Sequence, residues 1–413
     1  MTVFDQYRLG DILDIRSSSR VLESEYRDFG VPFLRGGELI KLDKGMLLEN
    51  NLFISEELYQ SLKKKTNVPK NGDLLITANG SVGYPYLVNL NHNFYFKDAI
   101  IWIKQNKKIS NKFIYYIYKS KIILEQIINN TFGSTIINYN LNQARKNLIP
   151  LPSLSQQTAI ANYIDNHTGK IDKEISLLEK KVEKLDEYKQ ALIYETVTKG
   201  LDKNVNFKDS CIDWIGMIPE HWEVKRVKEI SKWQTGFTPA SKNEEYYNGN
   251  DDWITIGDLD GKYVKDSKTK INGSLFPKEW ITPANSLLFS FKLSIGQVSF
   301  NEKEVFTNEA ICSFSSKSKI NLKYFYYAAP IFIVKNAKKN IYNADLLNQD
   351  LIANAVIVLP KNNEQLVIAN FLDEQCSKID KKKELINKKI ELLKEYKQSL
   401  IYEAVTGKIK IGE

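Results

Sequence analysis

The chain has 413 residues, which is enough for two or three domains with cores of their own. No apolar run approaches the roughly 20 residues that cross a bilayer, and no apolar signal region opens the chain, so we expect a cytoplasmic protein without a membrane partner. The three cysteines are odd in number and far apart, which predicts reduced thiols. The three histidines have no second His or Cys at ligand spacing, which predicts no metal site.

The formal net charge is +8, and the excess lies mainly in the first segment. Residues 1–150 carry 20 Lys and Arg against 14 Asp and Glu, with Lys63, Lys64 and Lys65 as a local cluster. A basic surface is typical of a protein that binds a polyanion. Because excess lysine is also common in AT-rich genomes, charge alone favours a nucleic-acid partner only weakly.

Residues 1–150 contain short β-like runs separated by Asn-Gly and Gly-Gly turns. A helix is predicted over 111–129, where apolar residues recur near helical spacing. Pro150 and Pro152 mark a stop after this segment. We expect strands within residues 7–12, 31–37, 71–77 and 97–103.

Residues 151–206 predict a long helix with a narrow apolar seam. Apolar side chains repeat every seven positions, and Ile175 and Val182 fill the alternate seam position. Such a seam has to pair with another helix, which is the signature of a coiled coil. The seven-residue repeat is formed by Ile164, Ile171, Leu178, Leu185 and Leu192.

The second half of the chain repeats the first. Residues 356–413 align with the first helical unit at an offset of 208 positions without a gap, and about half of the aligned residues are identical. The seam recurs from Leu372 to Leu400, although Lys383 and Lys397 also fall on it, so we expect imperfect pairing. Residues 207–355 repeat the globular order more faintly. The corresponding segments are 224–230, 253–259, 285–290 and 307–311, followed by a helix from Leu322.

These patterns predict an α+β protein with a pseudo-twofold internal repeat. Its two globular domains are separated by two long helices that supply each other's partner in a coiled coil. The expected boundaries are 1–150 for the first globular domain, 151–206 for the first helical spacer, 207–355 for the second globular domain and 356–413 for the second spacer.

No set of residues predicts catalysis. Residues 257–262 are superficially like a phosphate-binding loop, but the glycines are one residue too close and Tyr263 stands where Ser or Thr must hold magnesium. Nucleotide-binding, esterase and methyl-transfer motifs are missing from the sequence as well. We therefore expect a protein without catalytic residues of its own.

Polar loops at matching places in the two globular domains are the better candidates for recognition. Amide, hydroxyl and ammonium groups hydrogen-bond base edges or phosphates, and neighbouring glycines let the backbone come close. For any single residue, ordinary turn chemistry explains the pattern equally well. The predicted DNA-binding residues are Arg35, Lys63, Lys64, Thr77, Asn79, Ser81 and Tyr84 in the first domain and Thr235, Thr238, Lys242, Ser290, Lys292, Ser294 and Gln297 in the second.

The chain resembles the specificity (S) subunit of a type I restriction–modification system over its whole length. The resemblance is carried by the two helical units, each with Leu-Pro, Gln, Ile-Ala-Asn, Asp and Lys-Ile-Asp in order and ending in Tyr-Lys-Gln-x-Leu-Ile-Tyr-Glu-x-Val-Thr. The segment 214–224, Trp-Ile-Gly-Met-Ile-Pro-Glu-His-Trp-Glu-Val, is equally typical, and the first domain lacks this lead-in.

The resemblance implies that each globular domain is a target recognition domain for one half of a bipartite double-stranded DNA sequence. The helices would form an antiparallel coiled coil that spaces the two domains. As a helix, residues 170–199 would be roughly 45 Å long, somewhat more than one DNA turn of about 34 Å.

The resemblance also implies partners. Two methyltransferase (M) subunits would bind the helical units, and restriction (R) subunits would join them. S-adenosylmethionine, ATP and Mg²⁺ would belong to these subunits, with no cofactor on this chain. The residues predicted to bind partner subunits are Gln157, Asn162, Asp165, Asp172, Tyr188, Gln190 and Glu195 in the first helical unit and Gln365, Asn370, Asp373, Asp380, Tyr396, Gln398 and Glu403 in the second.

Three alternatives stay open at this point. The chain is the specificity partner of a related methyltransferase–nuclease outside type I, a coiled-coil scaffold whose globular ends bind proteins, or an enzyme with its own nuclease or transferase site. Binding of duplex DNA through two separated half-sites would exclude the protein scaffold, and the enzyme would need activity from this chain alone.

Overall fold

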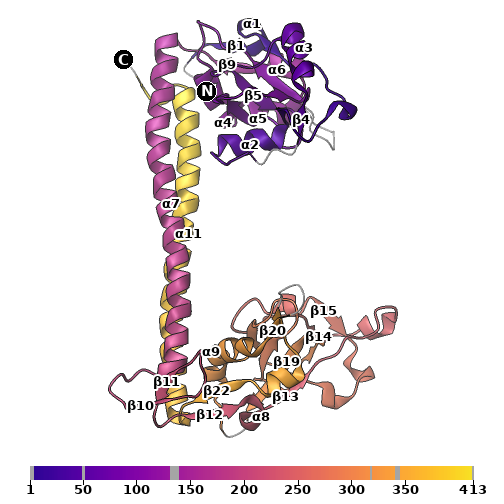
Figure 1. Ribbon diagram of the computed structural model, residues 1–413, viewed down its shortest axis with the longest axis vertical. Coiled ribbons are helices and arrows are strands. Elements are labelled where there is room, and N and C mark those ends of the chain that lie inside the picture. Colours follow the sequence, from indigo (N-terminus) through magenta and orange to yellow (C-terminus); the bar gives the residue numbers. More distant parts are fainter. Residues whose placement is uncertain (1–3, 49–51, 131–138, 317–318, 340–344, 412–413) are drawn as a thin grey trace. The chain divides into compact units, whose positions relative to one another are not determined.

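The computed structural model describes residues 4–48, 52–130, 139–316, 319–339 and 345–411. The chain forms two compact units, one of residues Met1–Lys180 with Ile386–Glu413 and the other of residues Lys181–Leu385. Two long helices, α7 (Leu154–Lys199) and α11 (Asn362–Val405), each contribute to both units (Figure 1). Within the described residues, no helix combines the length and the apolar character that crossing a membrane requires.

Unit 1 is built around a four-stranded antiparallel sheet in the order β2-β8-β5-β6. A three-stranded sheet, β4-β3-β7, has β3 and β7 parallel, and β1 pairs with β9. The strands are β1 (Gln6–Arg8), β2 (Ile15–Arg16), β3 (Val31–Leu34), β4 (Phe53–Ile54), β5 (Leu74–Thr77), β6 (Pro85–Leu87), β7 (Tyr95–Phe96), β8 (Ile100–Ile103) and β9 (Leu148–Pro150). The shorter helices are α1 (Leu9–Ile12), α2 (Gly36–Asp43), α3 (Glu56–Thr66), α4 (Asn111–Lys119), α5 (Ile122–Asn130) and α6 (Leu141–Lys146).

The two principal sheets of unit 2 repeat the strand order of the corresponding sheets of unit 1. Their orders are β13-β19-β16-β17 and β15-β14-β18, with β14 and β18 parallel. β12 pairs with β22, as β1 pairs with β9. The strands are β10 (Phe207–Asp209), β11 (Met217–Pro219), β12 (Glu223–Arg226), β13 (Ser231–Thr235), β14 (Asp251–Ile254), β15 (Thr269–Ile271), β16 (Leu287–Ser290), β17 (Val298–Phe300), β18 (Phe306–Thr307), β19 (Ile311–Ser316), β20 (Lys338–Lys339), β21 (Asp345–Leu346) and β22 (Val356–Leu359). The shorter α-helices are α8 (Val227–Ile230), α9 (Leu322–Phe332) and α10 (Gln349–Ala353).

The matching strand orders confirm the predicted internal repeat and the α+β class. The central strands β5 and β16 are fully buried along their length and occupy the same place in the two sheets. This burial explains why their sequences, Leu-Leu-Ile-Thr and Leu-Leu-Phe-Ser, are almost continuously apolar. The faint likeness of the two globular segments is therefore a likeness of buried strands and their order.

The single helix predicted over 111–129 is wrong at its centre, where the chain forms α4 and α5 instead. Lys121 lies between them in the left-handed region, with φ +69°. The Ser120 hydroxyl donates to the Ile117 carbonyl at 2.7 Å and occupies an acceptor at the end of α4. The apolar spacing continues across the break, so it gave no signal of the turn.

Each unit shares its core with the two long helices. In unit 1 the core includes Ile160 and Ile164 of α7 together with Ile401 and Val405 of α11. In unit 2 it includes Val197 of α7, with Ile368, Ala369 and Leu372 of α11. The globular part of each unit and its helical segments therefore form one hydrophobic core. Folding of either part contributes to the stability of the other.

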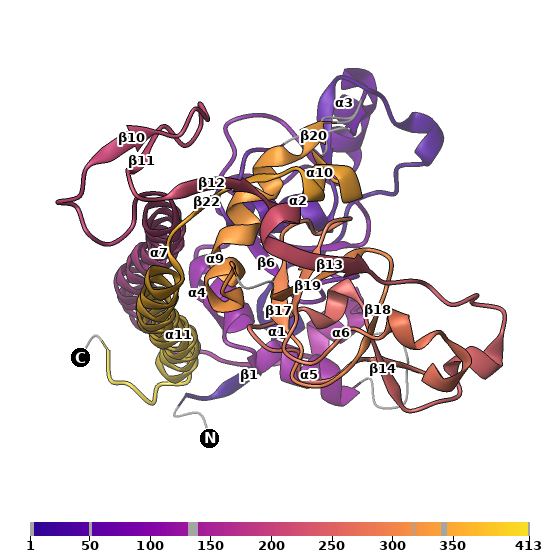
Figure 2. The same ribbon diagram turned by 90° about the horizontal axis from the view of Figure 1, so that it is seen from below.

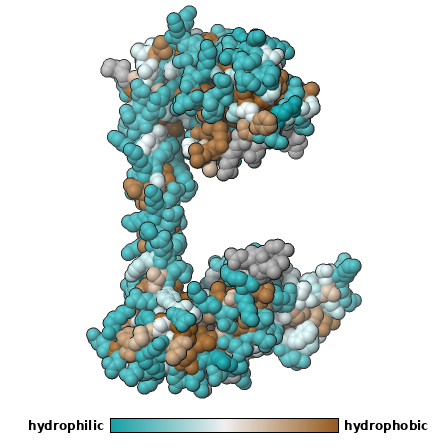
Figure 3. Space-filling model, in the orientation of Figure 1, coloured by the Kyte–Doolittle hydropathy of each residue, from teal (hydrophilic) through white to brown (hydrophobic). Residues whose placement is uncertain are grey.

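The two helices pair in antiparallel directions, as predicted, and lie side by side in both ribbon views (Figures 1 and 2). In unit 1, Lys397 contacts Asp172, and in unit 2, Lys189 contacts Asp380. Residue numbers therefore increase along α7 in the direction in which they decrease along α11. Ile171, Ile379, Ile390 and Leu400 are buried on the predicted seam. The face of the helices that Figure 3 shows is mainly hydrophilic.

Lysines on the seam form ion pairs with aspartates of the opposite helix, which compensates for the imperfect apolar pairing that the sequence predicted. The Lys189 ammonium lies 2.8 and 2.7 Å from the Asp380 carboxylate oxygens, and that of Lys397 lies 2.6 and 2.7 Å from those of Asp172. Lys383 reaches Asp186 in the same way. Each lysine lays its stem along the seam and carries its charge to a carboxylate on the other helix. The first two pairs are equivalent under the 208-residue offset.

Reversing one of these charges should destabilise the helix pair. Asp380→Lys would place a second ammonium opposite Lys189, and we expect a loss of about 1 kcal/mol in the free energy of unfolding by urea. The double change Lys189→Asp with Asp380→Lys should restore most of the loss.

The matched control is Lys184→Glu, since Lys184 is 76% exposed and pairs with Glu187 along its own helix. It should change the stability by about 0.5 kcal/mol or less. A double variant as unstable as Asp380→Lys alone would contradict a direct pairing of the two charges.

Candidate nucleic-acid interface

The loops after β5 and β16 have the same internal hydrogen bonds. The Thr77 hydroxyl accepts from the Tyr84 N–H at 3.0 Å and donates to the Ser81 carbonyl, and the Ser290 hydroxyl accepts from Gln297 at 3.0 Å and donates to Ser294. The backbone N–H groups of Gly83 and Gly296 donate to the carbonyls of Thr77 and Ser290 at 2.8 and 2.9 Å. Two recognition candidates chosen from sequence alone thus share one loop structure.

Some residues of this loop are buried and support its conformation, and others are exposed. Thr77 and Ser290 are 1% and 0% exposed, so their hydroxyls hold the loop and do not face solvent. Gly83 and Gly296 have φ of +76° and +92°, which favours glycine. The tips that the loop presents are exposed. They consist of Asn79, Gly80 and Ser81 in unit 1 and of Lys292, Leu293 and Ser294 in unit 2, with Gln297 exposed beside the second tip.

Tyr84, another predicted contact, is half-buried at the end of the first loop. Its hydroxyl donates to Asp43 at 2.7 Å, and Tyr115 donates to the other oxygen of the same carboxylate at 2.8 Å. The Lys119 ammonium is 2.7 Å from Asp43 and 3.8 Å from the centroid of the Tyr84 ring. Gln398 of α11 donates to the Lys119 carbonyl at 2.7 Å. The cluster connects the loop through α4 to the long helix.

Burial shapes the charges of this cluster. Burial, followed by the interaction with Asp43, raises the pKa values of Tyr84 and Tyr115. Burial also lowers the pKa of Lys119, an effect that Asp43 opposes. Both tyrosines therefore stay neutral donors to one carboxylate. Sequence reasoning missed Asp43 and Lys119 because they are far apart in the chain and lie in no motif.

The basic candidates of unit 1 divide into two kinds. Arg35 precedes α2 and pairs with Glu38 at 3.2 Å, so part of its charge is neutralised. Lys63 and Lys64 are exposed on α3. Lys63 borders a groove of about 920 Å³ that has no Asp or Glu among its lining residues. Its polar lining consists of Lys63, Lys70, His92, Asn67, Asn71, Asn91 and Asn93, with Tyr59 beside them.

In unit 2 the segment after β13 is anchored by an aromatic ring. Phe237 lies 4.7, 4.5 and 5.8 Å, between ring centroids, from Phe276, Trp280 and Phe306. Of the predicted contacts around it, Thr238 donates to Glu309 and Lys242 is exposed. The third, Thr235, accepts from Gln349 at 2.9 Å. Thr235 and Thr238 therefore have partners within the chain, whereas Lys242 faces solvent.

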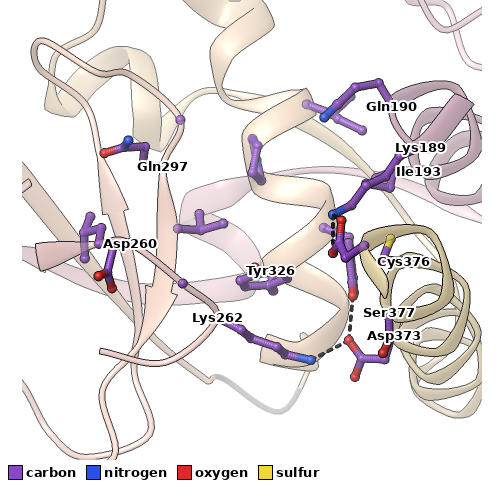
Figure 4. Close-up of a pocket in the computed structure, with 18 of the residues that line it drawn as sticks. Lys189, Gln190, Ile193, Asp260, Lys262, Gln297, Tyr326, Asp373, Cys376 and Ser377 are labelled. Carbon is purple, nitrogen blue, oxygen red and sulfur yellow. Dashed lines mark hydrogen bonds and ion pairs between the residues drawn. The ribbon is translucent and has the colours of Figure 1, made fainter. Parts of the chain in front are cut away.

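A cavity of about 860 Å³ in unit 2 is lined by a predicted DNA-binding residue and by residues predicted to bind partner subunits (Figure 4). Gln297 of the loop lines it with Gln190, Asp373 and Asp380 of the long helices. Lys262 pairs with Asp373, which also accepts from Tyr327 at 2.6 Å. Lys189 pairs with Asp380. Because these two lysines are matched by carboxylates, the cavity is a poor site for a phosphate.

Several residues predicted to bind partner subunits have structural bonds within the chain. Gln157 and Gln365 are 1% and 0% exposed, and each accepts from the backbone N–H before a short helix while donating to the carbonyl of Pro152 or Pro360. Asp165 accepts from Tyr116, as Asp373 does from Tyr327. Further bonds of this kind join Asp172 to Lys397, Glu195 to Lys203 and Glu403 to Ser399.

Two matched pairs of these residues remain on the surface. Tyr188 and Tyr396 are 56% and 57% exposed, and Asn162 and Asn370 are exposed as well. Each pair is related by the 208-residue offset. The two helical units thus present the same residue types to solvent, which is the arrangement expected of two equivalent binding surfaces. Among the described residues, no group of three or more His, Cys, Asp or Glu is placed to hold a metal ion.

The fold defines a class of protein in which two like α+β domains are joined through a pair of antiparallel helices. The family model for the type I restriction modification DNA specificity domain matches this chain twice, over residues 2–184 and 219–395. The chain therefore belongs to the family of specificity subunits of type I restriction–modification systems.

Similar proteins include two curated relatives. The type I restriction enzyme MjaVIII specificity subunit of Methanocaldococcus jannaschii is 24% identical over 87% of this chain and 84% of the relative. A putative type I restriction enzyme specificity subunit of Haemophilus influenzae, S.HindORF215P, is 30% identical over 45% of this chain. That match spans 46%, or about half, of the length of the Haemophilus protein.

Solved structures agree in fold. A chain from a type I restriction–modification system, whose complex assembly and conformational transition were described, superposes with a TM-score of 0.77 at 15% identity, covering 98% of both chains. The crystal structure of the HsdS subunit from Thermoanaerobacter tengcongensis superposes with a TM-score of 0.58 at 16% identity, over 98% of this chain and 97% of that one. At such low identity these matches establish the fold alone.

Removing the supporting hydroxyl of the first loop should destabilise it. Thr77→Val keeps the shape of the side chain but leaves the Tyr84 N–H and the Ser81 carbonyl without that partner. We expect a loss of about 1–3 kcal/mol in the free energy of unfolding and faster hydrogen exchange at the Tyr84 amide.

Asn79→Ala is the matched control on the same loop, because Asn79 is exposed. It should change stability by about 0.5 kcal/mol or less. Equal effects of the two substitutions would mean that the buried hydroxyl does not support the loop.

Proposed function

We propose that this chain is the DNA-reading subunit of a methyltransferase or restriction complex, and that each globular domain recognises one half of a bipartite target. The single observation that carries the proposal is the loop that occurs in both units with one hydrogen-bond pattern and different tips. The supporting Thr77 and Ser290 are alike, whereas Asn79 and Gly80 are replaced by Lys292 and Leu293. A constant support with variable tips suits two readers of different sequences.

The exposed groups of these tips have the chemistry of base readout. The Asn79 amide donates and accepts, which suits an adenine edge, and the Lys292 ammonium suits guanine or a phosphate. The groove beside Lys63 adds several basic and amide groups without a carboxylate. Such a surface supports backbone contacts, which position a protein on DNA without specifying its sequence.

The matched residues on the long helices support two like partners. Tyr188 and Tyr396, with Asn162 and Asn370, recur at the same places in the two helical units. We assign these surfaces to two methyltransferase subunits, to which restriction subunits are added. S-adenosylmethionine, ATP and Mg²⁺ belong to those partners in this proposal, and this chain contributes binding and positioning.

Genome-wide adenine methylation tests the proposal directly. In a host that expresses this chain with its neighbouring methyltransferase, we expect a bipartite methylated motif that vanishes when the gene for this chain is deleted. The methyltransferase expressed alone is the control. If no methylation depends on the gene, a protein-binding scaffold replaces the DNA reader as the better account.

Salt dependence tests the basic groove. Lys63→Gln with Lys64→Gln should weaken binding to a duplex carrying that motif and to an unrelated duplex by similar factors. The slope of log K against log salt should become shallower by about 2 if both lysines meet phosphates. Binding is measured with the chain in complex with its methyltransferase.

Lys184→Gln is the matched control, since it removes one exposed lysine from the long helix. It should leave the slope unchanged. An unchanged slope for the double variant would exclude α3 from the DNA-binding surface.

A further inference from the structure

Leu293 occupies an unusual position at the tip of the loop after β16. It is 92% exposed, the highest value among the large apolar side chains that the structure describes. Its φ is +58°, in the left-handed region that a residue with a branched side chain seldom adopts. An exposed leucine in this conformation contributes little to the core and strains the backbone.

The first unit shows what the loop itself requires. Gly80 stands at the equivalent place with φ +73°, and a Cβ added there would meet nothing within 4 Å. The loop therefore imposes a left-handed residue at its tip, and glycine meets that requirement without strain. The leucine of the second unit is not needed for the loop to form.

The base of the second loop is fixed on both sides of this leucine. Phe291 is 4% exposed, and Ile295 packs against the core of unit 2. The buried Ser290 hydroxyl connects Gln297 to Ser294 across the loop. Leu293 thus projects from a rigid support, between an exposed lysine and an exposed serine that suit DNA.

We propose that Leu293 is an apolar specificity contact that touches a base in the half-site read by the second domain. The inference rests on the proposed function and adds a residue and a chemistry to it. Apolar side chains read DNA either against a thymine methyl group or by entering a base step. In both cases the ligand is the apolar surface of a base, and the loop tip replaces water there.

The test uses Leu293→Gly in the full chain with its methyltransferase, read out as the methylated motif. Glycine relieves the left-handed strain, so the melting temperature should be unchanged or higher. We expect one position of one half-site to become degenerate, with on the order of tenfold less discrimination between bases there. The other half-site should stay as in the wild type.

Four further variants define what the leucine supplies. Leu293→Met keeps an apolar side chain and should keep the motif, whereas Leu293→Asn tolerates the left-handed region but is polar and should relax it. Gly80→Leu, the mirror change in the first unit, should alter only the opposite half-site. Leu177→Ala removes a 67% exposed leucine from α7 and should leave the motif intact.

The outcomes separate this inference from the proposed function. A wild-type motif that persists unchanged in Leu293→Gly would overturn the role of Leu293 and leave the DNA reader in place. Equal relaxation by methionine and glycine would also overturn it, since the apolar surface would then be irrelevant. If the wild-type chain directs no methylation, the proposed function itself fails.

Discussion

The pairing of α7 with α11 constrains everything else in the molecule. A seam that contains lysines cannot bury their charges, because removing an ammonium from water is strongly unfavourable. Lys189, Lys383 and Lys397 avoid this by reaching Asp380, Asp186 and Asp172 on the opposite helix. Only the antiparallel register brings these partners together, so the charges select direction and alignment while the apolar residues supply most of the stability.

The duplication uses this constraint twice. Lys189 with Asp380 and Lys397 with Asp172 are equivalent pairs, and the amides of Gln157 and Gln365 make equivalent bonds at the start of each helix. Substitution at any of these positions breaks a contact between the two helices or, for the glutamines, between a helix and its globular part. The side chains at the loop tips are under no such constraint, because buried hydroxyls and glycines fix the conformation of the loop. This physical division explains why the helical units remained alike while the loop tips diverged.

The sequence predicted the long helices and their seam, since these depend on periodic burial, and it predicted the matching order of the strands, since the central strands are continuous apolar runs. It aligned the loops after β5 and β16, whose role in recognition stays a prediction, but it did not separate Thr77 and Ser290, which support the loops, from Asn79 and Lys292, which are exposed. It also could not show that Gln157 and Asp172 bond within the chain. Motif residues can be shared for structural or binding reasons, and only the contacts of the folded chain distinguish the two. Asp43 and Lys119 gave no sequence signal, because their contact exists only in the folded unit.

The joint between each globular domain and the helices shows which part of this architecture is free to change. Asp165 of α7 and Asp373 of α11 are equivalent under the 208-residue offset, and each accepts from a tyrosine and pairs with a lysine of its own globular part. The tyrosines lie on α4 and α9, whereas the lysines come from different elements, Lys112 from α4 and Lys262 from the segment after β14. Only the origin of the lysine is therefore specific to each domain, while the tyrosine–carboxylate bond, the apolar contacts and the buried glutamine are common to both. Contacts that recur in both units, although most other side chains differ, are therefore the ones that attach a globular part to the pair of helices.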